Sequence, residues 1–279
     1  AIATDPNSLS YVVEPVDGLW IIGMDACLYE NNAGQPHSET GGKFKAETQQ
    51  WIENQIQQGA SKDKIIFGIM HHGLVEHFAG QKLNPISAEY VIENWQSLSD
   101  KFADLGMKVV FTGHFHANDI VKRTSAEGFI FEVETGSTVS YPCPYRILTL
   151  TEDRKLNINT SLIESVNYDT GQMTFQQYAQ NYLYNGIIEL AVYTLMQEEY
   201  GLSQPEAEAL APLIASAYVT HYAGDEVMPA DAQPAISMMK QSGDQLQIMF
   251  ATILESMFTD LPPADNNITI DLQTGNVTQ

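Results

Sequence analysis

Two short apolar runs, each ending in a pair of histidines, place the strongest constraint on how this chain folds. Residues 64–70 and 108–112 are rich in β-branched side chains, which is typical of strands buried on both faces. A helical pattern over residues 88–105 lies between them. A strand, a helix and a second strand in this order predict a crossover that places the two strands parallel in one sheet.

The position of these histidines makes them candidates for a metal site. They follow the carboxyl ends of the two predicted strands, where open α/β sheets place their ligand-binding crevices. Imidazole binds Zn, Fe, Mn or Ni, and a His-x-His pair can direct two rings into one cavity or onto neighbouring ions. The four residues are His71, His72, His114 and His116.

The rest of the chain divides into a sheet-rich part and a helical part. The first part has a hairpin pattern, an amphipathic helix and three further strand patterns, at residues 11–24, 44–58, 119–123, 129–135 and 145–151. The second part has helical patterns at residues 175–200, 204–222 and 232–258. We therefore predict an α/β (α+β) domain over residues 1–165, a small all-α domain over 166–262 and a polar tail over 263–279.

The formal net charge of -22 argues against nucleic acid as a partner, because such a surface repels phosphate backbones. Apolar runs stay below the ~18 residues that a membrane span requires. Cys27 and Cys143 lie far apart without a CxxC spacing, which argues against a thiolate metal site and leaves their pairing open. Together with the acidic composition, these features favour an exported protein, periplasmic or extracellular. They leave the oligomeric state open.

The two histidine motifs, in their order and setting, resemble the last two signature motifs of calcineurin-like metallophosphoesterases, the superfamily of Ser/Thr phosphatases and purple acid phosphatases. The first is an apolar strand followed by His-His-Gly, and the second is Gly-His-Phe-His. A helix similar to residues 47–53 precedes the first motif in that family, and a segment similar to residues 134–137 follows the second. The resemblance covers about residues 10–150.

This resemblance implies the C-terminal portion of a two-sheet sandwich flanked by helices, and a hydrolase that acts on phosphate esters. Phosphomonoesters or phosphodiesters would be hydrolysed by a metal-bridging hydroxide on two divalent ions, Mn, Fe or Zn. His71 and His114 resemble ligands of one ion, and His116 resembles a ligand of the other. His72 resembles a residue that supports the ligands or faces the substrate.

The earlier motifs of that family, Asp-x-His, Gly-Asp and Gly-Asn-His-Asp or Gly-Asn-His-Glu, do not occur at the corresponding places in this sequence. They supply the bridging carboxylate, and imidazoles alone do not hold two ions about 3.5–4 Å apart. We therefore expect this portion alone to be inactive or nearly so. We also expect an upstream segment of the same polypeptide to complete the site and to cover an exposed apolar face of the sheet.

Several alternatives stay open at this point. A different His-x-His metallohydrolase is a second enzyme class, although the spacing disfavours an amidohydrolase barrel and a cupin. A degenerate phosphoesterase fold that acts as a scaffold, with the acidic helical domain as its interaction surface, is the non-enzyme alternative. We interpret His37, His77 and His221 as ordinary polar or packing residues, with an approach of His77 to the substrate left open.

Overall fold

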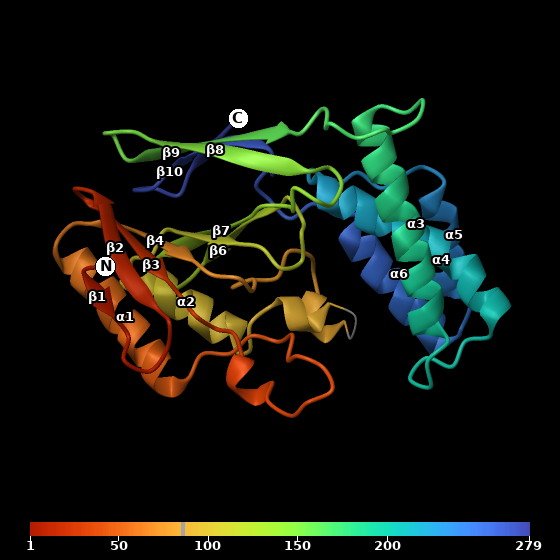
Figure 1. Cartoon of the computed structure of the whole chain (residues 1–279), viewed down its shortest axis with the longest axis horizontal. Coiled ribbons are helices and arrows are strands. Elements are labelled where there is room, and N and C mark those ends of the chain that lie inside the picture. The colour runs from red at the N-terminus through yellow and green to blue at the C-terminus, as the bar shows by residue number, and fades with distance from the viewer. Residues whose placement is uncertain (85–86) are drawn as a thin grey trace.

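The computed structural model of the chain describes residues 1–84 and 87–279. A seven-stranded sheet lies between a layer of helices on one face and a four-stranded antiparallel sheet on the other. A bundle of helices packs at one end of these layers (Figure 1). The α/β class, the two sheets and the following helical part are therefore confirmed.

The larger sheet has the strand order β1-β2-β3-β4-β5-β7-β6. Strands β3, β4, β5 and β7 run parallel, β2 and β6 pair antiparallel with β3 and β7, and β1 pairs antiparallel with β2. The predicted crossover is confirmed, since β4 and β5 are parallel neighbours with Phe67 opposite Val109. The strands are β1 (Ala3–Thr4), β2 (Tyr11–Val16), β3 (Leu19–Gly23), β4 (Ile65–Ile69), β5 (Val109–Thr112), β6 (Ile120–Thr124) and β7 (Phe129–Glu134).

Two helices, α1 (Ala46–Ser61) and α2 (Trp95–Leu105), cover one face of this sheet. Helix α1 buries Ile52 and Ile56 completely, at the helical spacing that the sequence predicted. Helix α2 begins later than expected because Asn94, with φ of 58°, lies in the left-handed region and separates it from a 3₁₀ turn. It ends at a left-handed glycine, a common helix C-terminus.

The second sheet covers the other face and corrects two predictions. It consists of β8 (Pro144–Leu150), β9 (Lys155–Leu162), β10 (Asn267–Asp271) and β11 (Val277–Thr278). Residues 263–279 are thus not a polar tail, because the alternating Ile268 and Ile270 pack against Phe131 between the sheets. The chain itself covers the apolar face that the sequence predicted to be exposed.

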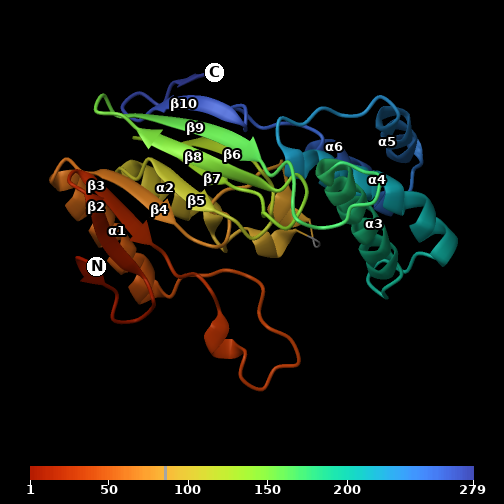
Figure 2. The ribbon, with the colours of Figure 1, turned by 45° about the horizontal axis from the view of Figure 1, so that its top comes forward.

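The helical part contains α3 (Phe175–Leu195), α4 (Gln204–Ala223), α5 (Ala232–Gln241) and α6 (Gln245–Met257) (Figure 2). The single helix predicted over 232–258 is divided, because Gly243 adopts a φ of 76° and the Asp244 carboxylate caps α6 by accepting two backbone N–H groups. Phe115, from the second histidine motif, belongs to the core of this bundle. Within the described residues, helices long and apolar enough to cross a membrane are absent.

Candidate metal site and a buried ionic cluster

The histidine motifs meet at the carboxyl edge of the larger sheet, directly after β4 and β5. The ring centroids of His71 and His114 are 4.4 Å apart, and His72 lies 5.2 Å and 4.8 Å from these two rings. His116 follows two residues later, with its Nδ1 3.3 Å from the hydroxyl of Ser140. The structure therefore gathers three of the four predicted rings closely and places the fourth beside them.

The backbone of the second motif is strained at both of its histidines. His114 has a φ of 73° and His116 a φ of 68°, in the left-handed region that residues with a Cβ rarely adopt. Each such residue costs about 1–2 kcal/mol. Backbone strain of this kind persists where surrounding structure enforces it, and it concentrates at functional sites.

Burial keeps the imidazoles of His72, His114 and His116 uncharged. Burial, with a smaller contribution from the ring of His72, lowers the pKa of His114 to about 4. Burial also lowers the pKa of His72 and of His116. Neutral imidazole is the form that binds a metal, so these rings need not lose a proton to do so near pH 7.

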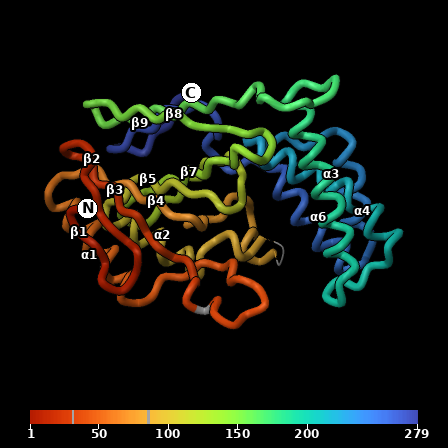
Figure 3. The backbone as a smooth tube through the Cα atoms, viewed as in Figure 1, coloured from red at the N-terminus to blue at the C-terminus, as the bar shows by residue number. Residues whose placement is uncertain are grey.

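The segment of residues 33–43 precedes α1 (Figure 3), and its Thr40 lies against two of the histidines. The backbone carbonyl of Thr40 lies 3.0 Å from Nε2 of His72 and 3.0 Å from Nε2 of His114. A carbonyl only accepts, so both Nε2 atoms donate and the lone pairs are on Nδ1. Nδ1 of His72 is buried without a hydrogen-bond partner.

Carboxylates do not join this set. Within residues 1–84 and 87–279, three groups of His, Cys, Asp or Glu side chains could share one ion, because their ligand atoms all lie within 4.8 Å of one another. His71, His114 and His116 belong to none of these groups. The structure thus presents a cluster of imidazoles rather than a finished single-ion site.

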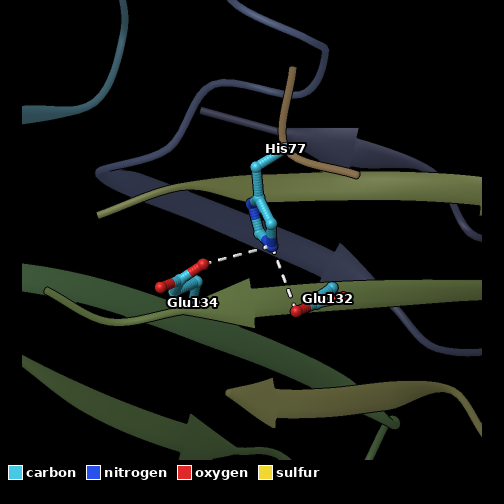
Figure 4. A group of neighbouring side chains, drawn as sticks. All are labelled: His77, Glu132 and Glu134. Carbon is cyan, nitrogen blue, oxygen red and sulfur yellow. Dashed lines mark ion pairs between the residues drawn. The ribbon is translucent and has the colours of Figure 1, made fainter. Parts of the chain in front are cut away.

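A second cluster, which the sequence analysis missed, is centred on His77 (Figure 4). Nε2 of His77 lies 3.0 Å from Oε1 of Glu132 and 3.4 Å from Oε2 of Glu134. On the other side of the ring, Nδ1 lies 3.3 Å from Oδ2 of Asp119. All four side chains are at most 2% exposed, so these charges interact in a dry environment.

Glu132 connects this cluster to the first histidine motif. Its carboxylate accepts hydrogen bonds from the backbone N–H groups of Leu74 and Val75, at 2.7 and 2.6 Å, and from the hydroxyl of Thr112 at 2.6 Å. These bonds fix the loop that follows His72. Burial raises the pKa of the Glu134 carboxyl to about 8, although His77 and a backbone hydrogen bond from His116 oppose the shift.

One signal in the sequence could have revealed this cluster. Strand β7 reads Phe-Ile-Phe-Glu-Val-Glu, and all six residues are buried. Two acids inside an apolar strand require buried partners, since an unpaired buried charge is costly. The partners themselves come from distant parts of the chain, so the sequence gives no indication of which residues they are.

Comparisons with known proteins leave the family of this chain unassigned. Known family models do not match the sequence, and a search of curated proteins found no similar one. Among solved structures, the chain is similar to a dimetal phosphatase from Danio rerio, with 14% identity and a TM-score of 0.42. The match covers 55% of this chain and 58% of that protein, so the chain spans little more than half of its length. A likeness at this level assigns neither a fold family nor an activity.

Proposed function

We propose that this chain provides the histidine ligands of a metal-dependent phosphoesterase, which hydrolyses phosphomonoesters or phosphodiesters. The observation that supports this most directly is the 4.4 Å separation of the His71 and His114 rings at the ends of adjacent parallel strands. The low pKa of His114 and the strained backbone of its motif agree with a site built for metal binding. The resemblance of the two motifs to calcineurin-like enzymes supplies the reaction class.

In this proposal His71, His114 and His116 bind divalent ions, Mn, Fe or Zn. When bound, such ions neutralise negative charge on the phosphoryl oxygens and lower the pKa of water. His72 positions the site, since its buried ring packs edge-on to His71 and donates to the carbonyl of Thr40. Ligation by His114 through Nε2 would require its contact with the carbonyl of Thr40 to break.

The ligand count leads to the second part of the proposal. A pair of ions needs a bridging carboxylate, and Glu132 already uses both oxygens in hydrogen bonds with Leu74, Val75 and Thr112. We therefore propose that a further segment of the polypeptide supplies the carboxylate ligands. Residues 1–279 alone are expected to bind metal but to hydrolyse phosphate esters slowly.

The test compares metal binding by the wild-type chain with binding by His71→Ala and His114→Asn. Asparagine is chosen at position 114 because it tolerates a positive φ. Each variant is expected to lose one bound Mn²⁺ or Zn²⁺ ion, measured by metal analysis after dialysis. His37→Asn, in an exposed loop, is the control and keeps the wild-type content. Unchanged metal content in both site variants would rule the proposal out.

The outward face of α3 favours a second candidate function, that of a scaffold. Tyr182, Leu190 and Tyr193 are 71%, 57% and 67% exposed, a cluster of large apolar side chains in an acidic region. A chain that takes up no metal at saturating Mn²⁺ or Zn²⁺ would support the scaffold over the enzyme.

A further inference from the structure

A cavity of about 340 Å³ lies between α3 and α4, beside the proposed metal site. Small-molecule sites are mostly apolar, have a few polar groups and measure about 300–1,000 Å³. Apolar side chains of both helices line this cavity together with four tyrosines and one carboxylate, from Tyr90, Tyr200, Tyr218, Tyr222 and Glu199. We call it the tyrosine cavity. Its size and lining suit a small organic ligand.

Two of these tyrosines are tied to the histidine motifs. The carbonyl of Tyr90 accepts a hydrogen bond at 2.8 Å from the backbone N–H of Gly73, in the first motif, and its ring centroid lies 4.7 Å from that of His114. The carbonyl of Tyr222 accepts a hydrogen bond at 3.2 Å from the backbone N–H of Asn118, just after the second motif. A ligand in the tyrosine cavity therefore lies next to the proposed metal ligands.

The four aromatic rings come from three segments of the chain. Tyr218 and Tyr222 lie one turn apart on α4, both buried, with ring centroids 5.8 Å apart. Tyr90 comes from a 3₁₀ turn, and Tyr200 follows α3. The face of an aromatic ring carries partial negative charge and attracts a cation. Several such rings around one cavity favour a positively charged ligand.

The charges of this part of the molecule favour the same kind of ligand. Among the lining residues, all within the described part of the chain, the Glu199 carboxylate is the one charged group. After Lys155 the sequence has fifteen Asp and Glu residues and one Lys or Arg, Lys240, which pairs with Glu255. Such a surface repels phosphate and attracts cations.

We propose that the tyrosine cavity binds an alkylammonium group, and that the substrate is the phosphate ester of an alcohol that carries this group. Aromatic side chains are the usual receptor for quaternary ammonium ligands. The phosphate would lie at the histidine rings and the ammonium in the cavity, where Glu199 offsets its charge. The substrate role, but not the binding of the ammonium, rests on the function proposed above.

The first experiment measures binding of choline to the metal-free chain by calorimetry, so that its result does not depend on a metal. The comparison ligand is the neutral isostere of choline, in which a tert-butyl group replaces the trimethylammonium group. Choline should bind at least about tenfold more tightly, because only its charge interacts with the rings and Glu199. Equal affinities, tighter binding of the isostere, or no binding of choline would overturn the proposal.

Two pairs of variants locate the bound ammonium group. Glu199→Gln should weaken choline binding about threefold, whereas Glu198→Gln, its exposed neighbour outside the lining, should not change it. Tyr218→Leu keeps an apolar side chain but removes the ring, and should weaken binding about fivefold. Tyr193→Leu, on the exposed side of α3, is its control. Equal choline affinity within both pairs of folded variants would overturn the proposal.

A third measurement separates this proposal from the phosphoesterase function. In the chain loaded with Mn²⁺, phosphocholine should bind more tightly than choline, because its phosphate also contacts the ions. His71→Ala/His114→Asn should remove only that gain. If choline binds as expected but phosphocholine shows no gain, the cavity is confirmed and the phosphoesterase function is contradicted.

Discussion

At the scale of single residues, the two histidines after β5 show what the sequence can and cannot reveal. Gly-His-Phe-His after an apolar strand predicted that the rings would meet His71, and the structure brings them to the same edge of the sheet. The left-handed backbone at His114 and His116 was not predictable, because only the packing around the motif enforces it. A residue with a Cβ is retained there at a cost in stability.

That strain predicts an unusual effect of glycine. In metal-free protein, His116→Gly should be more stable than His116→Ala by about 1 kcal/mol, because glycine adopts a φ of 68° without penalty. Urea unfolding measures the difference. The same pair of substitutions at the exposed His37 should show no advantage of glycine. An alanine variant at position 116 that equals or exceeds the glycine variant would show that the backbone is relaxed.

The two cysteines should differ in reactivity. Cys27 is exposed and Cys143 is buried, and both are free thiols. Burial raises the pKa of both thiols, and Asp25 adds to the shift at Cys27, so the difference in reactivity comes from access, because only Cys143 is buried away from reagents. One thiol per native chain should therefore react quickly with Ellman's reagent, and Cys27→Ser should remove that reaction. Two fast thiols, or none, would contradict this arrangement.

At the scale of elements, periodicity predicted most of the helices and strands and failed where polar residues interrupt it. Helix α1 and strands β4 and β5 were predicted within a few residues, since each has a strong apolar pattern. Strands β9 and β10 were missed, because each alternates Leu or Ile with Asn or Thr and only the facing sheet shows that the apolar half is buried.

In strand β7, loss of the Glu132 carboxylate should lower the stability of the fold strongly. Glu132→Gln keeps the shape but removes the charge that pairs with His77 and accepts from Leu74 and Val75. Breaking a buried ion pair costs about 3–5 kcal/mol, and we expect a loss in that range by chemical denaturation. Glu127→Gln, at the exposed turn before β7, should change stability by less than about 0.5 kcal/mol. Equal stability of the two variants would contradict the anchoring role of Glu132.

Asp260, in the segment after α6, should make the stability of the fold depend on pH. Burial, with the nearby carboxylates of Glu226 and Asp119, raises the pKa of Asp260 from 3.8 to about 7. The folded state then binds more protons than the unfolded state between these values, so this group lowers stability as pH rises from about 4 to 7. Asp260→Asn should flatten that part of the profile, measured as Tm against pH. A profile with the same slope as wild type would contradict the shift.

At the scale of the whole molecule, the fold was predictable in class and the candidate site only in part. The order of strand, helix and strand predicted the parallel sheet, and the histidine motifs predicted where these imidazoles gather. The return of residues 267–278 to the second sheet was not predictable, since that pairing joins β10 to a strand more than a hundred residues away. The buried cluster around His77 depends on the same kind of distant contact, between Asp119 and the end of α4.

The central claim is that the rings after β4 and β5 bind metal. An anomalous difference map from crystals of the chain grown with Zn²⁺, recorded at the zinc edge, tests it most directly. We predict a peak about 2.0–2.1 Å from imidazole nitrogens of His71 and His114. A map with zinc elsewhere in the molecule and none at these two rings would contradict the account.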